Sequence, residues 1–254
     1  MAVAAEGSFA DGAAENGGVE GGGFEDGAAE GAAFDAVVLA GGLARRLEGA
    51  DKPALVVGGA TLLDRVIEAC ARARDVVCVG PQRPTRRPVR WTREDPPGSG
   101  PVAALAAALE LPRSPDDAGA PSAPSASPAP PAPSVVVLAA DLPFLRAELV
   151  HRLWINSSGH DGAVLSDREG RDQWLAACYR RDVLTGRIAE LRAETGGTAG
   201  LSLRRLLAGL DLVRVPDPDG QSFDVDTWED VRHVRRLVDG GGADQRPPGT
   251  EPDR

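Results

Sequence analysis

The residue types best suited to chemistry gather in one glycine-rich stretch. The apolar segment 37–40 ends in the pair Gly41-Gly42, and two arginines and a lysine follow shortly after. Backbone N–H groups can close around an anion at glycines, because no Cβ atom stands in the way. Cationic side chains supply the charge that a triphosphate needs, and here they are Arg45, Arg46 and Lys52. The pattern predicts a buried strand followed by a tight phosphate-binding loop.

Lys52 is the only lysine in the chain, so nearly all of the 28 basic side chains are arginines. A lysine ammonium is a compact charge on a flexible stem, and it can meet a single phosphate oxygen in a way that a planar guanidinium cannot. We interpret Lys52 as a phosphate ligand. The alternative is that the only lysine of the chain stands at this position by chance. The loop matches neither familiar nucleotide fingerprint, because Pro53 follows the lysine and the two glycines are adjacent.

A second stretch places a carboxylate at the end of a predicted strand. Residues 135–140 are a continuous apolar run, as expected for a parallel strand that is covered on both faces. Asp141 follows that run, and ligands of such sheets bind beyond the carboxyl ends of the strands. Because Pro143 turns the chain, Asp141 is placed to hold a hard cation that bridges nucleotide phosphates. The alternative is structural, with Asp141 capping a helix that starts near Leu145.

A third stretch, residues 95–104, is a glycine-proline loop that leads into an alanine-rich helix predicted over 102–110. Gly98 and Gly100 allow the backbone to approach a ligand closely, and the N-terminus of the helix adds a positive dipole. The arginines of the preceding segment, 82–94, are expected to be mostly solvated.

The elements around these stretches alternate between helices and strands. Thr61 is expected to cap a helix with a periodic apolar stripe, and the β-branched run 76–79 is typical of a buried parallel strand. Segments 163–166 and 174–179 predict an antiparallel pair, and 212–215 predicts a further strand. This order indicates an α/β fold with three layers and a mainly parallel central sheet.

Composition divides the chain into one domain and two tails. We expect the domain to span residues 34–238, with a Pro/Ala/Ser-rich inserted loop at 112–133, and we expect 1–33 and 239–254 to be disordered. Of the formal net charge of −10, the tails account for −7 and −2, which leaves the domain nearly neutral. A nearly neutral domain argues against a nucleic-acid partner.

Other features narrow the setting. No apolar run approaches the roughly 18 residues of a membrane span, and no leader pattern begins the chain, so a cytoplasmic location without a membrane partner is expected. The three scattered cysteines support neither a disulfide framework nor a zinc site. The histidines His151, His160 and His233 are too dispersed to form a ligand set and are expected on the surface.

Four motifs occur in a recognisable order. Residues 39–52 resemble L-A-G-G-x-[AS]-x-R-[ML]-G-x-x-K with the third glycine displaced by one position, from 48 to Gly49, and residues 97–103 read P-G-x-G-P-[LV]-A. Asp141 begins D-x-P-[FY], and residues 223–230 resemble F-x-[ND]-[IV]-[ND]-T-P-E-[DE] with tryptophan in place of proline. Together these motifs resemble the nucleotidyltransferases that include molybdenum cofactor guanylyltransferase (MobA-type).

The resemblance implies a Rossmann-like nucleotidyltransferase fold and transfer of GMP from GTP to the phosphate of molybdopterin, with release of pyrophosphate. It implies that Asp141 binds Mg²⁺ and that Asp226 adds a second contact; the alternative around Asp226 is structural, since Thr227 would cap the last helix. Asp95, or Glu94, would help to read the base. Proteins of molybdenum insertion or molybdoenzyme maturation would be further partners.

Residues and resemblance together assign three sets of site residues. The catalytic set is Lys52, Arg46 (or Arg45) and Asp141, and the metal set is Asp141 and Asp226. The nucleotide-binding set is Leu39, Ala40, Gly41, Gly42, Arg45, Lys52, Asp95, Gly98, Gly100, Pro101 and Asp141. Three alternatives stay open: a cytidylyltransferase of the same cofactor, a sugar-phosphate nucleotidyltransferase, and a non-catalytic nucleotide-binding regulatory protein.

Overall fold

The computed structural model describes residues 34–42, 47, 49–113 and 130–239. All of them belong to one of the two units into which the chain divides, Ala32–Arg254. The predicted N-terminal tail, nearly all of the predicted C-terminal tail, most of the predicted insertion and the site residues Arg45 and Arg46 lie outside the described residues.

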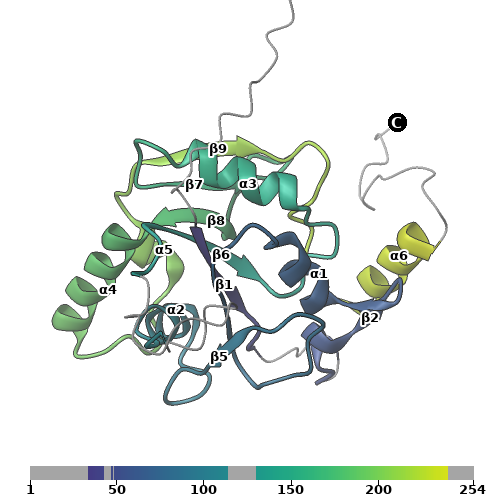
Figure 1. Ribbon diagram of the computed structural model, residues 1–254, viewed down its shortest axis with the longest axis horizontal. Coiled ribbons are helices and arrows are strands. Elements are labelled where there is room, and N and C mark those ends of the chain that lie inside the picture. The colour runs from purple at the N-terminus through teal and green to yellow at the C-terminus, as the bar shows by residue number, and fades with distance from the viewer. Residues whose placement is uncertain (1–33, 43–46, 48, 114–129, 240–254) are drawn as a thin grey trace, which may run out of the picture. The chain divides into compact units, whose positions relative to one another are not determined.

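A seven-stranded sheet forms the middle of this unit, in the order β5-β4-β1-β6-β8-β7-β9 (Figure 1). All neighbouring strands are parallel except where β8 pairs with β6 and with β7, so the expected mainly parallel sheet is confirmed. The expected antiparallel pair is β7 and β8. The strands are β1 (Phe34–Leu39), β4 (Val76–Val79), β5 (Arg90–Thr92), β6 (Ser134–Ala139), β7 (Gly162–Ser166), β8 (Asp172–Arg180) and β9 (Leu212–Pro216).

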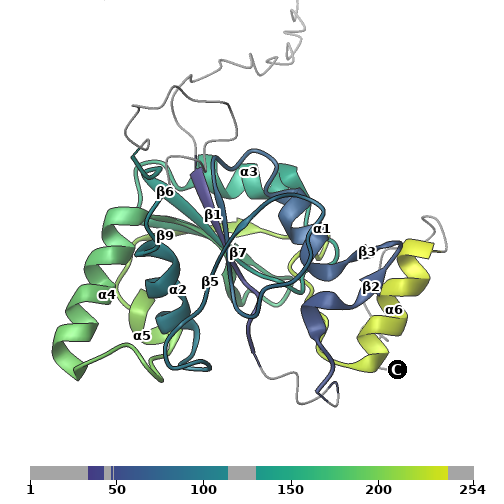
Figure 2. The same ribbon diagram turned by 60° about the horizontal axis from the view of Figure 1, so that its bottom comes forward.

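Helices cover both faces of the sheet (Figures 1 and 2). Buried side chains of α1 and α3 pack on one face, and those of α2, α4 and α5 pack on the other, which gives the expected three layers. Among the described residues, none of these helices is long and apolar enough to cross a membrane. The helices are α1 (Leu62–Ala69), α2 (Pro101–Leu109), α3 (Ala147–Asn156), α4 (Arg181–Thr195), α5 (Leu203–Leu207) and α6 (Trp228–Asp239).

Beyond Asp35 in β1 and Ser134 in β6, the two central strands are apolar because both faces of the sheet are covered. In β1, Ala36 and Val38 contribute to the core under α1 and α3, whereas Val37 contributes to the core under α2 and α4. Val136 and Val137 of β6 divide in the same way. Successive side chains of a strand point to opposite faces, so a strand buried on both faces needs an unbroken apolar run.

The helix ends follow the predicted capping residues. Thr61 Oγ1 accepts a hydrogen bond from the backbone N–H of Asp64 at 2.9 Å, which starts α1 as expected. At α6, Asp230 Oδ2 accepts from the backbone N–H of Thr227 at 2.7 Å, and Thr227 Oγ1 accepts from Asp230 N–H at 3.2 Å. This reciprocal pair fixes the chain immediately after Asp226.

A smaller third cluster lies beside the sheet and supports the loops that carry the site. It joins α6 to the hairpin β2 (Val56–Val57) and β3 (Ala60–Thr61), next to the 3₁₀ turn η2 (Lys52–Ala54). Figure 2 shows α6 alongside this hairpin. Its buried side chains are Leu47, Val57, Leu62, Val225, Val231 and Val234. The cluster anchors both Lys52 and the segment around Asp226.

Candidate functional site

The predicted loops meet at one edge of the sheet, beyond the carboxyl ends of β1 and β6. These strands are parallel neighbours with Leu39 opposite Ala139, and Ala140 N–H donates to Leu39 O at 3.2 Å. Gly41 and Asp141 therefore leave adjacent strands at the same level. Such an edge is where open parallel sheets bind ligands.

Three carboxylates come together at this edge. Asp141 follows β6, while Asp224 and Asp226 precede α6, and one oxygen from each lies within 4.8 Å of the others. The backbone N–H of Val225 donates to Asp141 O at 3.2 Å and ties the two segments together. We call these three residues the aspartate cluster. Asp141 Oδ1 is buried and has no hydrogen-bond partner among the described residues.

Lys52 inserts its ammonium into the aspartate cluster. Its Nζ contacts Asp141 Oδ2 and donates to Asp226 Oδ1 at 2.7 Å, and the side chains of Lys52 and Asp141 are each only 16% exposed. Burial opposes the charge on Lys52, but attraction to Asp141 and Asp226 outweighs it, so the pKa of Lys52 is raised above its ordinary value.

The charged form of Asp224, unlike that of Lys52, is disfavoured at this site. Loss of water around it, together with the nearby carboxylates of Asp141 and Asp226, raises the pKa of Asp224, and attraction to Lys52 offsets this only in part. In the aspartate cluster, three carboxylates thus lie beside a single ammonium.

Arg83 holds the backbone beside Lys52 in place. Its Nε donates to Asp51 Oδ2 at 2.8 Å and its Nη2 to Asp51 Oδ1 at 2.6 Å, which is a two-pronged ion pair next to η2. Its Nη1 donates to Ala40 O at 3.0 Å and to Pro81 O at 2.8 Å. One guanidinium thus joins the loops after β1 and β4 to η2. Arg83 is an exception to the expectation that the arginines of 82–94 are mostly solvated, since its side chain is 13% exposed.

Gly80 allows the loops after β1 and β4 to touch. Its φ is +143°, and a Cβ atom there would lie 2.8 Å from the carbonyl carbon and oxygen of Ala40 and 2.9 Å from Gly41 N. Any larger residue would push the glycine loop away from β4. The conformation of the loop at Gly41-Gly42 therefore depends on a third glycine, Gly80, which follows the neighbouring strand β4.

The predicted loop before α2 follows β5 at the same edge of the sheet. Glu94 Oε1 accepts a hydrogen bond from the backbone N–H of Gly98 at 2.8 Å, and Gly100, with φ +94°, precedes the first residue of α2, Pro101. Glu94 thus shapes the loop from within, whereas Asp95 is exposed. The base contact predicted for Asp95 stays a prediction.

The structure brings some of the predicted site residues together, and it shows that others are engaged in structural contacts. Lys52, Asp141 and Asp226 form one group beside the loop that carries Gly41 and Gly42. In contrast, the oxygens of Leu39 and Ala40 accept hydrogen bonds from Ala140 and Arg83, and the Ala40 side chain is buried in the core.

Sequence reasoning missed Asp224 as a member of the cluster. The signal was present, because Asp224 and Asp226 stand two positions apart around the apolar Val225. In extended chain, such spacing puts both carboxylates on one side and the apolar residue on the other. Val225 is indeed fully buried.

Comparison with known proteins identifies the family of the chain. Residues 36–214 match the model of the MobA-like NTP transferase domain. A relative from Mycobacterium bovis, named probable molybdenum cofactor guanylyltransferase, is 33% identical over 153 residues, which cover 58% of this chain and 68% of that protein.

Solved structures share the fold. The molybdopterin-guanine dinucleotide biosynthesis protein A of Archaeoglobus fulgidus superposes with a TM-score of 0.58 at 20% identity, over 82% of this chain and 100% of that one. The 2-C-methyl-D-erythritol 4-phosphate cytidylyltransferase of Thermus thermophilus gives 0.57 at 19% identity, over 82% and 99%. The fold, the order of the motifs and the extent of the match lead to one conclusion: the chain belongs to the MobA-like NTP transferase family.

Proposed function

We propose that this protein moves GMP from GTP to the terminal phosphate of molybdopterin, or of its molybdenum-loaded form, and releases pyrophosphate. The name of the mycobacterial relative supports the choice of substrates, and membership of the family supports the coarser reaction, nucleotidyl transfer. The observation that carries the proposal is the aspartate cluster with Lys52 at the carboxyl edge of the sheet.

In this reaction an oxygen of the acceptor phosphate bonds to the α-phosphorus of GTP. The bond from that phosphorus to the oxygen bridging the α- and β-phosphates breaks, and pyrophosphate leaves with the electron pair. Such transfers depend on positioning and charge neutralisation rather than on a covalent enzyme nucleophile. Lys52 suits this task, because Asp51 and Arg83 hold its backbone while its flexible stem can carry the ammonium to a phosphate oxygen.

We propose that the aspartate cluster holds Mg²⁺. The residues fit such an ion, since three carboxylates converge and Asp141 Oδ1 is buried without a hydrogen-bond partner among the described residues. Mg²⁺ binds carboxylate oxygens, usually together with substrate phosphates. When bound, it neutralises the charge on those phosphates.

The remaining assignments belong to the same proposal. Arg46 or Arg45 would steady the phosphates, and the backbone at Gly98 and Gly100 would border the base, with Asp95 beside it. We propose that residues 34–238 form the catalytic domain and that the protein acts in the cytoplasm. Proteins of molybdenum insertion or molybdoenzyme maturation are its proposed partners.

The test is pyrophosphate release by the full chain with Mg²⁺ and molybdopterin, in parallel with GTP, CTP, ATP and UTP. Of these four nucleotides, we expect only GTP to give pyrophosphate release. A panel of sugar phosphates replaces molybdopterin in a second series and is expected to give none. The matched control is Glu229→Gln, which changes an exposed carboxylate in the first turn of α6 and should leave the rate unchanged.

Other outcomes would redirect the proposal. Release with CTP would favour the cytidylyltransferase alternative, for which the Thermus structure is a precedent in fold only. Release only with sugar phosphates would keep nucleotidyl transfer and overturn the acceptor. Nucleotide binding without release under any condition would favour a regulatory protein.

A further inference from the structure

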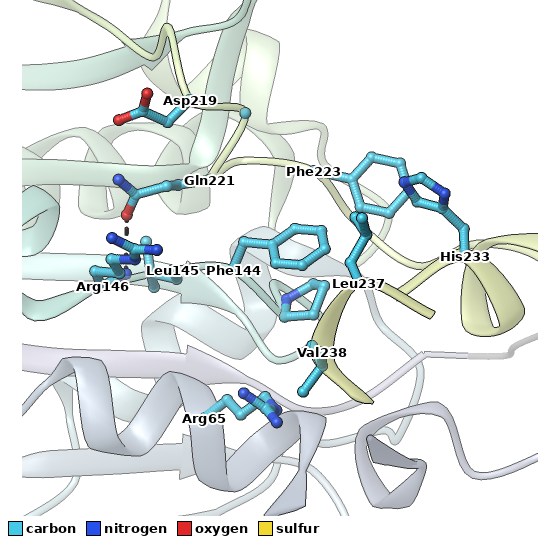
Figure 3. Close-up of a pocket in the computed structure, with 12 residues that line it drawn as sticks. Arg65, Phe144, Leu145, Arg146, Asp219, Gln221, Phe223, His233, Leu237 and Val238 are labelled. Atoms are coloured by element: carbon cyan, nitrogen blue, oxygen red, sulfur yellow. Dashed lines mark hydrogen bonds between the residues drawn. The ribbon is translucent and has the colours of Figure 1, made fainter. Parts of the chain in front are cut away.

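A cavity of about 400 Å³ lies between α6, α1 and the segments that follow β6 and β9 (Figure 3). Phe223 lines this cavity, whereas none of the three residues of the aspartate cluster does. The cavity is therefore separate from the proposed catalytic site, and the proposed reaction makes no use of it. Its volume falls in the range of roughly 300–1,000 Å³ that is typical of small-molecule sites.

Aromatic rings form one wall of the cavity. The ring centres of Phe144 and Phe223 lie 6.0 Å apart with an interplanar angle of 44°, and Phe223 meets the ring of His233 at 6.1 Å in a T-shaped contact. Figure 3 shows Leu237 of α6 next to the Phe144 ring. Aromatic rings pack well against the faces and edges of other flat rings, so this wall suits a planar guest.

His233, at this wall, has a ring nitrogen that lacks a hydrogen-bond partner among the described residues. Contrary to the surface position expected from the sequence, the residue is only 9% exposed, and its Nε2 is buried without a hydrogen-bond partner among the described residues. Buried polar atoms of folded proteins nearly always have a partner, and leaving one unpaired costs free energy. Nε2 exposes almost no surface, so a ligand atom supplies the missing partner once a neighbouring side chain moves aside.

The rest of the lining gives the cavity a positive balance. Nε and Nη2 of Arg65 both donate to Val57 O, at 3.2 and 2.6 Å, which fixes the guanidinium and leaves Nη1 without a partner among the described residues. Arg146 is exposed; its backbone N–H donates to Gln221 Oε1 at 3.0 Å, while its guanidinium has no partner in the described part of the chain. Asp219 is the single acidic residue in the lining.

We propose that this cavity binds a small aromatic carboxylate. Its flat ring packs against Phe144 and Phe223, its carboxylate meets the guanidinium of Arg146, and a polar atom of the ligand pairs with His233 Nε2. The inference is independent of the proposed reaction, because the cavity shares no residue with the aspartate cluster.

The test uses indole-3-acetate and 4-hydroxybenzoate as probes, since each has a carboxylate and a second polar atom, with indole-3-acetamide and 4-hydroxybenzamide as neutral counterparts of the same shape. Binding to the full chain is followed by calorimetry and by the imidazole proton resonances, which are few because the chain has three histidines. We expect at least one acid to shift the His233 resonances and to bind about tenfold more tightly than its amide, as losing one charge-assisted hydrogen bond predicts.

Two variants locate the site. Arg146→Gln should weaken binding of that acid about tenfold, and Arg236→Gln, which changes an exposed arginine of α6 outside the cavity, should leave it unchanged. His233→Phe should also weaken binding while keeping a ring at the wall; if that variant fails to fold, Arg146→Gln decides.

The proposal is overturned by any of three results. One is the absence of binding by both acids up to about 10 mM, where even fragment-sized ligands of a formed site are detected. The second is equal affinity for acids and amides. The third is binding that Arg146→Gln leaves intact, which would place the acids elsewhere on the protein.

Discussion

Strand β1 has a charged group at each end, and the two groups differ in their balance of charge. At its start, Asp35 accepts from Arg181 at 2.7 Å and from the backbone of Ala132 at 3.0 Å, and it pairs with Arg113 at 2.5 Å. Beyond its end, the three carboxylates of the aspartate cluster lie beside the ammonium of Lys52. At the first end two arginines pair with Asp35, and Arg113 also lies 3.7 Å from Asp75, whereas at the second end three carboxylates share one ammonium.

The pKa shifts of the basic residues record this difference. At the start of β1, burial and repulsion from Arg113 outweigh the attraction of Asp35 and Asp75 and lower the pKa of Arg181. At the other end, the carboxylates outweigh burial and raise the pKa of Lys52. Two arginines share Oδ2 of Asp35, although its Oδ1 is buried without a hydrogen-bond partner among the described residues, whereas the aspartate cluster has one ammonium for three carboxylates. We therefore expect the first to serve stability and the second to serve chemistry.

The largest expected effect comes from removing Asp141. Asp141→Ala should lower the rate of pyrophosphate release by at least about 10³-fold, because the proposed metal loses its most buried ligand. The melting temperature should change little, since relieving the crowded negative charge offsets the lost ion pair with Lys52. A rate close to wild type at saturating Mg²⁺ would contradict the metal assignment.

The second largest effect is expected at the other end of β1, where Asp35 lies. Asp35→Asn should lower the free energy of unfolding by about 3 kcal/mol, because Arg113 and Arg181 would stay half-buried without their shared carboxylate. Denaturant titration measures this, and the rate of pyrophosphate release by the folded variant should equal that of wild type. A loss of activity without a loss of stability would show that both ends of β1 serve the reaction.

A smaller effect is expected from Lys52 acting as a counter-ion within the aspartate cluster. Lys52→Met should tighten binding of Mn²⁺ to the nucleotide-free protein about tenfold, because the ion no longer competes with an ammonium. Electron paramagnetic resonance of free Mn²⁺ gives this affinity directly. The matched control is Lys52→Arg, which keeps the charge and should bind Mn²⁺ much as wild type does; weaker Mn²⁺ binding by the methionine variant would contradict the competition.

The smallest effect concerns pH. The pKa of Asp224 is raised in the folded protein, so ionisation of this residue opposes folding, and the penalty is complete once the pH exceeds the raised value. Asp224→Asn should therefore be more stable than wild type at pH 7, by less than about 1 kcal/mol because the residue is exposed. The gain should disappear below the ordinary carboxyl pKa, where both proteins are neutral at this position. Melting curves from pH 3 to 7 test the sign.

Much of this protein could be predicted because local patterns carry it. The unbroken apolar runs of β1 and β6 predict strands covered on both faces, and Thr61 and Thr227 predict the starts of α1 and α6. The glycine pair after β1 and the aspartate after β6 predict where a ligand binds, since they follow the carboxyl ends of parallel strands. These inferences rest on neighbours in sequence, which a single chain displays.

Other features depend on residues that are far apart in the chain. Lys52 and Asp226 are 174 positions apart and meet only because the small cluster of α6 and the β2–β3 hairpin brings them together. Arg83 joins Asp51 to Ala40 from the loop of another strand, and His233 is buried because α6 turns that face towards Phe223. No local pattern reports such contacts.

The sequence by itself therefore determined most of the elements and the order of the motifs, and it singled out Lys52, Asp141 and Asp226 as candidates for the site. Tertiary structure decided that β8 runs antiparallel between β6 and β7, that Asp224 joins the other two carboxylates, and that a lysine sits among them. The physical reason is that charge balance and burial are sums over neighbours in space, and packing alone chooses those neighbours.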